Sequence, residues 1–263
     1  LAVRDAAVTV LELGRRSISL PDGRFRFDGL EPGRYTLVLG PAETYVPRAV
    51  DLKVAPDGVD LGILGLVPTL PPVPMTAADG GSLAACGDSV LSLEPMALPE
   101  DLALSFSCLE RLDDLPVPPP AGRLPLAAMH LSPESLGLVL PGQLRVSLPS
   151  QPRYAAGVNL DLLRLDLDRA LWRPAGTLTV TADGRVAEGQ IMGLGDYLVA
   201  APPFGAFGGQ QQPATGLLRL STSVSLDGTP ADRVDPGAAV VYLDLSLGGL
   251  AAGRLQVRTV DAA

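Results

Sequence analysis

Only a few residues of this chain have the types and spacing that chemistry requires, and the first of them are two cysteines. Cys86 and Cys108 lie in strand-like runs on either side of a turn-like segment, residues 95–100, at equal distance from Ala97. A hairpin centred on Ala97 would place them opposite each other, where a disulfide forms if the Cα atoms are about 4.4–6.8 Å apart. We predict this disulfide. The alternative is two buried thiols that pack as small apolar side chains.

The single histidine, His130, is the second candidate. It lies in an apolar run close to Ser132 and Ser135, and a serine beside a histidine could act as nucleophile and base. The sequence lacks the G-x-S-x-G turn that presents such a serine in many hydrolases. We therefore interpret His130 as a structural residue or one at the rim of a β-sandwich. We predict no catalytic and no cofactor-binding residue, and we expect the protein not to be an enzyme.

Carboxylates offer the remaining chemistry. Asp161, Asp166 and Asp168, with Asp183 beyond them, could supply oxygen ligands for Ca²⁺. The alternating leucines explain Asp166 and Asp168 equally well as a solvated strand face. One histidine and two cysteines cannot close a tetrahedral zinc shell without carboxylates. We predict no metal ligand and no cofactor, and calcium binding stays open as the alternative.

The composition indicates that strands position these residues. The chain has 263 residues, long enough for two or three domains, and its 29 glycines and 26 prolines are spread throughout the sequence. That distribution fits many short strands joined by tight turns. We predict an all-β chain of tandem β-sandwich domains, immunoglobulin or transthyretin-like in type, joined by Pro/Gly-rich linkers.

Charge and hydropathy exclude two classes of partner. The net charge of −9 leaves no basic patch to neutralise phosphates, so we expect no binding to nucleic acid. The sequence has no run of about 18 apolar residues, so we expect no membrane span.

The first 67 residues carry the clearest pattern. Residues 21–37 (PDGRFRFDGLEPGRYTL) contain two turn signals around an alternating run with Phe25 and Phe27, followed by a return strand. With residues 7–10 (AVTV) and 59–64 (VDLGIL), this region resembles the carboxypeptidase regulatory-like domain, a transthyretin-like sandwich close to the B-type repeats of bacterial collagen adhesins. The family normally opens with one more strand, so we expect an edge strand to be absent from the chain.

A Pro-rich segment, residues 68–79, is the first expected linker. Short strand-like runs fill residues 80–202, which we interpret as a second β-sandwich. The runs at 80–83 and 90–101 and the Leu-Ser-Pro-Glu at 131–134 make it similar to the sandwich of ankyrins and netrin receptors, in its bacterial surface-protein form. Trp172 is expected to anchor its core or rim. Collagen-adhesin repeats often carry a Lys–Asn isopeptide bond, but Lys53 and Asn159 fall in different expected domains.

A second linker is expected at residues 203–215, followed by a tail, residues 216–263, with three strand-like runs at 217–226, 238–247 and 254–260. Three strands are few for an independent sandwich. We interpret the tail as a partial immunoglobulin-like module or as strands donated to another subunit.

These resemblances imply a function of the structural or adhesive kind. We expect a non-catalytic extracellular protein of a bacterium, either a segment of a surface protein or a fibre subunit assembled by strand addition. The expected partners are other copies of the chain or neighbouring surface proteins, with a carbohydrate or host-matrix ligand as a further option. The alternative is an accessory carbohydrate- or protein-binding module of a secreted enzyme.

Overall fold

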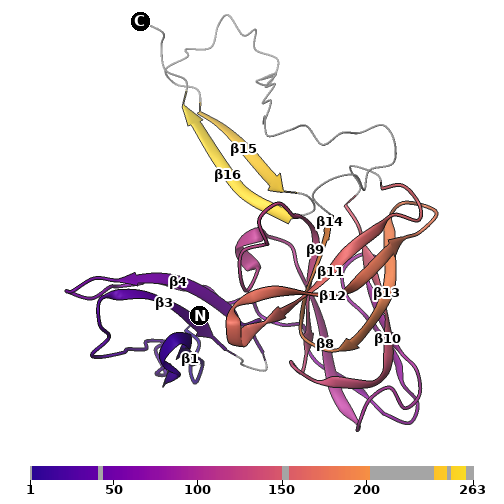
Figure 1. Cartoon of the computed structure of the whole chain (residues 1–263), viewed down its shortest axis with the longest axis horizontal. Coiled ribbons are helices and arrows are strands. Elements are labelled where there is room, and N and C mark those ends of the chain that lie inside the picture. Colours follow the sequence, from indigo (N-terminus) through magenta and orange to yellow (C-terminus); the bar gives the residue numbers. More distant parts are fainter. Residues whose placement is uncertain (1, 41–43, 150–153, 202–239, 248–249, 259–263) are drawn as a thin grey trace, which may run out of the picture.

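The computed structural model describes residues 2–40, 44–149, 154–201, 240–247 and 250–258, the last two ranges as backbone strands only. The prediction of an all-β chain is confirmed, because the described residues form three β-sheets (Figure 1). Their helical elements are three 3-10 turns: η1 Leu11–Leu13, η2 Leu112–Asp114 and η3 Leu167–Arg169.

The first sheet has four antiparallel strands in the order β2-β1-β3-β4. Their bounds are β1 Ala7–Val10, β2 Arg15–Ile18, β3 Gly33–Leu39 and β4 Arg48–Val54. One face of this sheet is apolar because strand residues alternate between the two faces. Its core is formed by Val8, Val10, Leu37, Leu39, Leu52 and Val54.

The segment around Phe25 and Phe27 differs from the expectation. It is not a strand but an extended loop whose two rings pack edge-on, 6.3 Å apart, against the core of the first sheet. The strand that the sequence pattern missed is β2, which pairs with β1 from the side opposite β3. Strand β1 therefore has a partner on each side.

The second sheet holds ten strands in the order β5-β8-β9-β14-β11-β12-β13-β10-β7-β6. It is one continuous sheet that curls into a near-barrel, whereas we expected two separate packed sheets (Figure 1). The strands are β5 Val73–Met75, β6 Gly81–Ala84, β7 Val90–Leu93, β8 Leu102–Leu109, β9 Leu124–Ser132, β10 Gly137–Ser147, β11 Asn159–Asp166, β12 Leu171–Val180, β13 Val186–Gly193 and β14 Asp196–Ala201.

The inside of the near-barrel is a single apolar core. Phe106, Met129, Leu162 and Tyr197 meet there from four neighbouring strands and are almost completely buried. Strand β9 was not predicted, because its mixture of small and apolar residues has no clean period of two. The β8–β9 and β9–β14 ladders nevertheless fix its register.

Four of these strands, β8, β9, β14 and β11, are also buried on their outer face, which is the face turned away from the barrel core. A second apolar cluster lies there, in which Leu163 and Leu198 of the sheet meet Val46 and the Trp172 ring. Trp172 is thus a core residue, and its indole N–H donates to the carbonyl oxygens of Val117 and Pro118 at 3.3 and 3.1 Å. Because Val46 belongs to the N-terminal region, this cluster joins the two sheets.

The segment expected to be a free linker, residues 68–79, is part of the fold. It contains β5, which pairs with β8, and the Leu70 N–H donates to the Ser107 hydroxyl at 2.7 Å. Nearby, the Ala49 N–H of β4 donates to the Pro116 carbonyl oxygen at 2.7 Å. The first sheet is therefore held to the region of the second sheet by a backbone hydrogen bond as well as by apolar packing.

The third sheet is the hairpin of β15 Val240–Leu247 and β16 Leu250–Arg258. It accounts for two of the three strand-like runs predicted in the tail. The run at 217–226 and the linker at 203–215 lie outside the described residues.

Candidate functional site

The outer face of the near-barrel carries a buried polar cluster. His130 of β9 and Asp196 of β14 are opposite each other in the β9–β14 ladder, so their side chains share a face. Apolar Met129 and Tyr197, next to them in sequence, point into the barrel core. The strand alternation that buries these neighbours therefore presents His130 and Asp196 on the opposite side of the sheet.

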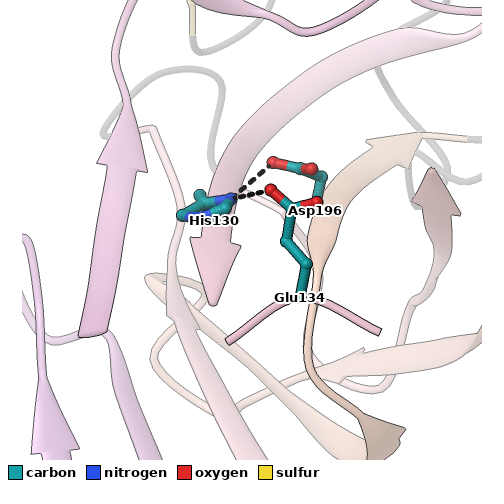
Figure 2. A group of neighbouring side chains, drawn as sticks. All are labelled: His130, Glu134 and Asp196. Atoms are coloured by element: carbon teal, nitrogen blue, oxygen red, sulfur yellow. Dashed lines mark hydrogen bonds and ion pairs between the residues drawn. The ribbon is translucent and has the colours of Figure 1, made fainter. Parts of the chain in front are cut away.

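The cluster consists of three side chains (Figure 2). Nδ1 of His130 lies 2.9 Å from Oδ1 of Asp196 and 3.9 Å from Oε1 of Glu134. Glu134 comes from the turn between β9 and β10. The side chains of His130, Asp196 and Glu134 are 2%, 3% and 17% exposed. The arrangement thus places one imidazole and two carboxylates together in the protein interior.

Burial dominates the electrostatics of this cluster. It raises the pKa of Glu134 to about 7, with the charge of Asp196 acting in the same direction and that of His130 opposing it. Burial also raises the pKa of Asp196, against the hydrogen bond and charge of His130 and the charge of Arg164. Burial disfavours the imidazolium, but the Asp196 hydrogen bond and both carboxylates outweigh it, so the pKa of His130 is raised.

Two serines of β8 share this outer face. Ser107 pairs with His130 in the β8–β9 ladder, and Ser105 pairs with Ser132 one position further along the same face. The Ser107 hydroxyl accepts the Leu70 N–H. Ser105 has a buried hydroxyl with no hydrogen-bond partner among the described residues. A serine–histidine pair for acyl transfer needs access for a substrate, and the burial of Ser107 and His130 does not provide it.

The two cysteines are joined by a disulfide with a Cα–Cα distance of 6.0 Å. Its position corrects the expected hairpin. Cys86 lies between β6 and β7, at one end of the ten-strand order, while Cys108 lies on β8, near the other end. Strands β7 and β8 do not pair with each other, since β7 pairs with β6 and β10. The disulfide therefore closes the seam of the near-barrel instead of stapling one hairpin.

The aspartates considered for calcium do not come together. Asp161 forms an ion pair with Arg123, and Asp166 forms ion pairs with Arg173 at 2.7 Å and with Arg169 at 3.3 Å. Among the described residues, the one group of three or more potential metal-ligating side chains is His130, Glu134 and Asp196.

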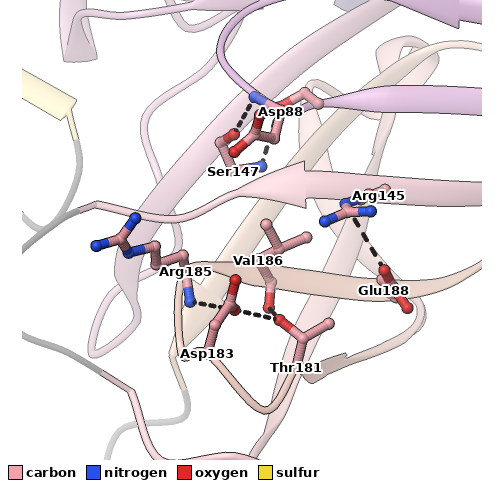
Figure 3. Close-up of polar contacts among 9 residues, drawn as sticks. Asp88, Arg145, Ser147, Thr181, Asp183, Arg185, Val186 and Glu188 are labelled. Atoms are coloured by element: carbon pink, nitrogen blue, oxygen red, sulfur yellow. Dashed lines mark hydrogen bonds and ion pairs between the residues drawn. The ribbon is translucent and has the colours of Figure 1, made fainter.

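Asp183 has a local structural role (Figure 3). Its Oδ1 accepts the Arg185 N–H at 3.0 Å and the Thr181 hydroxyl at 2.7 Å. These two bonds lower the pKa of its exposed carboxyl, whose slight desolvation acts in the opposite direction. The contacts stabilise the turn between β12 and β13, as expected for an aspartate in an Asx turn.

Lys53 and Asn159 lie in different sheets. Lys53 is on β4 opposite Arg34, and Asn159 is on β11, where its Oδ1 accepts the Thr179 hydroxyl at 2.9 Å. Lys53 and Asn159 therefore do not form the lysine–asparagine isopeptide bond of collagen-adhesin repeats.

Sequence reasoning identified His130 but missed its partners. Glu134 was part of the Leu-Ser-Pro-Glu motif that we used only to compare folds, and Asp196 was not singled out. A charged residue opening the otherwise apolar strand Asp196–Ala201 was the available signal, because a buried carboxylate requires a partner.

No protein-family model matches the chain, and a comparison with curated proteins gives no match either. Within the residues that the structure describes, no helix is long and apolar enough to cross a membrane.

Proposed function

We propose that the chain is a non-catalytic structural or adhesive segment of an exported bacterial protein, either part of a longer surface protein or a subunit of a fibre. The observation that carries the proposal is the disulfide across the seam of the near-barrel. Disulfides of this kind persist in oxidising compartments and are rare in the cytosol. That chemistry supports an exported protein, which we place on the cell surface or in a fibre.

The joint between the first two sheets supports a structural role. The outer-face cluster around Trp172 buries side chains from both regions, and β5 continues directly from the joint into the second sheet. Two domains on a loose linker rotate freely, whereas two sheets that share an apolar cluster and a backbone hydrogen bond keep one orientation. A rigid tandem unit suits a stalk or fibre that must hold its length.

We propose the same domain division that the resemblances imply. Residues 1–67 form a carboxypeptidase regulatory-like domain, residues 80–202 a sandwich-related domain, and residues 216–263 a partial immunoglobulin-like module. The apolar face of β1, β3 and β4 supports the first assignment. In this division, residues 68–79 act as an ordered connector.

Assembly by strand addition is the more specific form of the proposal. A donated strand pairs with an exposed sheet edge. Because β1 has a partner on each side, the first sheet offers only β2 and β4 as outer strands. Arg15 and Arg16 lie on β2, and charged residues on a short edge strand discourage pairing. Strand β4 also carries charged residues, and its Ala49 N–H already donates to the Pro116 carbonyl oxygen, so both edges have to be tested.

The alternative, an accessory carbohydrate-binding module, has less support. Sugar-binding modules stack rings on exposed aromatic side chains, and no large aromatic side chain is exposed among the residues whose burial is described. Trp172 is 9% exposed and lies in the outer-face cluster.

The proposal is tested with the full chain in the cell that produces it. Thiol-blocking mass spectrometry on protein trapped in its own compartment should find Cys86 and Cys108 oxidised, and an impermeant protease should cleave the chain on intact cells. Sedimentation and electron microscopy of the purified full chain should distinguish fibres from a single segment. A cytosolic protein with both thiols free would overturn the proposal. Retention on a glycan array with no surface or fibre localisation would favour the alternative.

A further inference from the structure

The cluster of His130, Glu134 and Asp196 gathers three potential metal-ligating side chains in the protein interior. His130 and Asp196 are nearly inaccessible to water and contact each other as a buried imidazole–carboxylate pair, with the Glu134 carboxyl beside them. Burying an uncompensated charge is costly, and buried charges are normally paired or bound to metal. A bound divalent cation would replace the protons that these side chains otherwise hold and would offset the negative charge of the two carboxylates.

The positions of the ligand atoms fit such a cation. The imidazole nitrogen and one oxygen from each carboxylate all lie within 4.8 Å of one another. Ligands about 2.0–2.2 Å from a tetrahedral zinc ion lie roughly 3.3–3.6 Å from each other. The distances from His130 Nδ1 to the two carboxylates, 2.9 and 3.9 Å, fall on either side of that range. A bound ion would therefore draw Glu134 closer to His130 and hold Asp196 further from it.

A bound ion would also account for the unbonded hydroxyl of a neighbouring residue, Ser105. The Ser105 hydroxyl is buried without a partner among the described residues, and Ser105 lies diagonally across the β8–β9 ladder from His130 on the same face. Buried hydroxyls are rarely left unbonded. A water molecule that completes the coordination of a metal would give Ser105 a hydrogen-bond partner, as outer-shell groups commonly do at metal sites.

We propose that His130 Nδ1, Glu134 and Asp196 bind one divalent transition-metal ion of the zinc type, with a water molecule as the fourth ligand. The mixed nitrogen and oxygen ligand set suits Zn²⁺ better than Ca²⁺, which takes oxygen ligands. The three ligands come from β9, from β14 and from the turn after β9. The buried ion would fix the turn onto the sheet, a structural role that needs no access for a substrate.

The experiment uses metal-free, tag-free full-length protein titrated with Zn²⁺, and with Co²⁺ as a spectroscopic probe. We expect one ion per chain by calorimetry and the visible absorption of a four-coordinate cobalt ion. X-ray absorption should detect one imidazole ligand by the multiple scattering from its ring. His130 is the only histidine and both cysteines are in the disulfide, so an imidazole ligand can come from no other residue. Failure to bind Zn²⁺ at micromolar concentration would overturn the proposal.

Variants separate this site from adventitious binding. Glu134→Gln keeps the shape of the side chain and removes its charge at the most accessible position of the three. It should weaken zinc binding by at least about tenfold, since even outer-shell changes cost ~10–100-fold in affinity. Asp166→Asn removes a carboxylate that is ion-paired elsewhere and should change the affinity less than about twofold.

Circular dichroism of both variants checks that they are folded. His130→Gln and Asp196→Asn should abolish binding, but both residues are deeply buried, so Glu134→Gln remains decisive if these variants fail to fold. Unchanged affinity in Glu134→Gln, or a loss in Asp166→Asn as large as in Glu134→Gln, would overturn the proposal. The result is independent of where the protein resides, so it does not stand or fall with the proposed function.

Discussion

Removing the disulfide is the most direct test of how the near-barrel is held closed. The perturbation is the double variant Cys86→Ser/Cys108→Ser. The two cysteines are 22 residues apart in sequence. In the chain-entropy account, opening a loop of that length gives the unfolded chain about 11 cal/mol/K more entropy, which lowers the free energy of unfolding by about 3 kcal/mol at 25 °C. For a domain of this size, the melting temperature should fall by about 6–12 °C.

The strands that lose protection from hydrogen exchange distinguish a disulfide that closes the seam from one that staples a hairpin. Without the disulfide, hydrogen exchange should accelerate in β6, β7, β5 and β8, which flank the seam. Strands β11 and β12, in the middle of the sheet, should keep most of their protection. A disulfide that merely stapled β7 to β8 would leave β5 unchanged.

The assay is urea unfolding of the oxidised protein, the double variant and the two single variants. Each single variant already breaks the bond, so each should lose nearly the whole amount, and the double variant should lose little more. A loss below about 1 kcal/mol, against the usual 2–4 kcal/mol for a disulfide, would refute this reasoning, as would additive effects of the two single changes.

Three further perturbations probe the buried polar cluster, the apolar cluster around Trp172 and the alkaline limit of stability. Asp196→Asn in metal-free buffer should lower the free energy of unfolding by about 3–5 kcal/mol, measured by urea titration, because it leaves buried His130 without its ionic partner; a loss no larger than that of Asp166→Asn would contradict it. Trp172→Ala should cost about 3–5 kcal/mol by the same assay, because it opens a cavity in the cluster that joins the two sheets; an unchanged midpoint would show that the joint is not packed as described. Burial raises the pKa of Tyr154 from 10.0 to about 12, so its favourable contribution is complete below pH 10 and is lost as the pH rises towards 12. Tyr154→Phe should flatten the decline of the melting temperature over that interval, and an identical decline in both proteins would rule the explanation out.

Local patterns in the sequence were sufficient for the class of fold. Alternation in residues 7–10 and 35–39, and the turn dipeptides between runs, correspond to strands in the first sheet. The pattern failed for Phe25 and Phe27, because an extended loop that covers a core face has the same alternation as a strand. It also failed for β9, which is buried on both faces, against the barrel core on one side and the outer-face apolar cluster on the other.

The candidate site was predictable only in part. The two cysteines were found by their spacing, although the hairpin argument gave them the wrong neighbours. Burial of Trp172 agrees with its interpretation as a core residue. The role of Glu134 could not be predicted, since nothing in the local sequence indicates that the turn after β9 folds back over His130.

The sequence by itself determined that this chain is built of strands, because side-chain alternation and turn chemistry act over only a few residues. Tertiary structure alone decided that His130 meets Asp196, 66 residues away, and that Cys86 reaches Cys108 across a seam. Alternation indicates which residues of one strand share a face, but the order and register of the strands depend on how the whole sheet curls around its core. That closure is a property of all ten strands together, and no single segment encodes it.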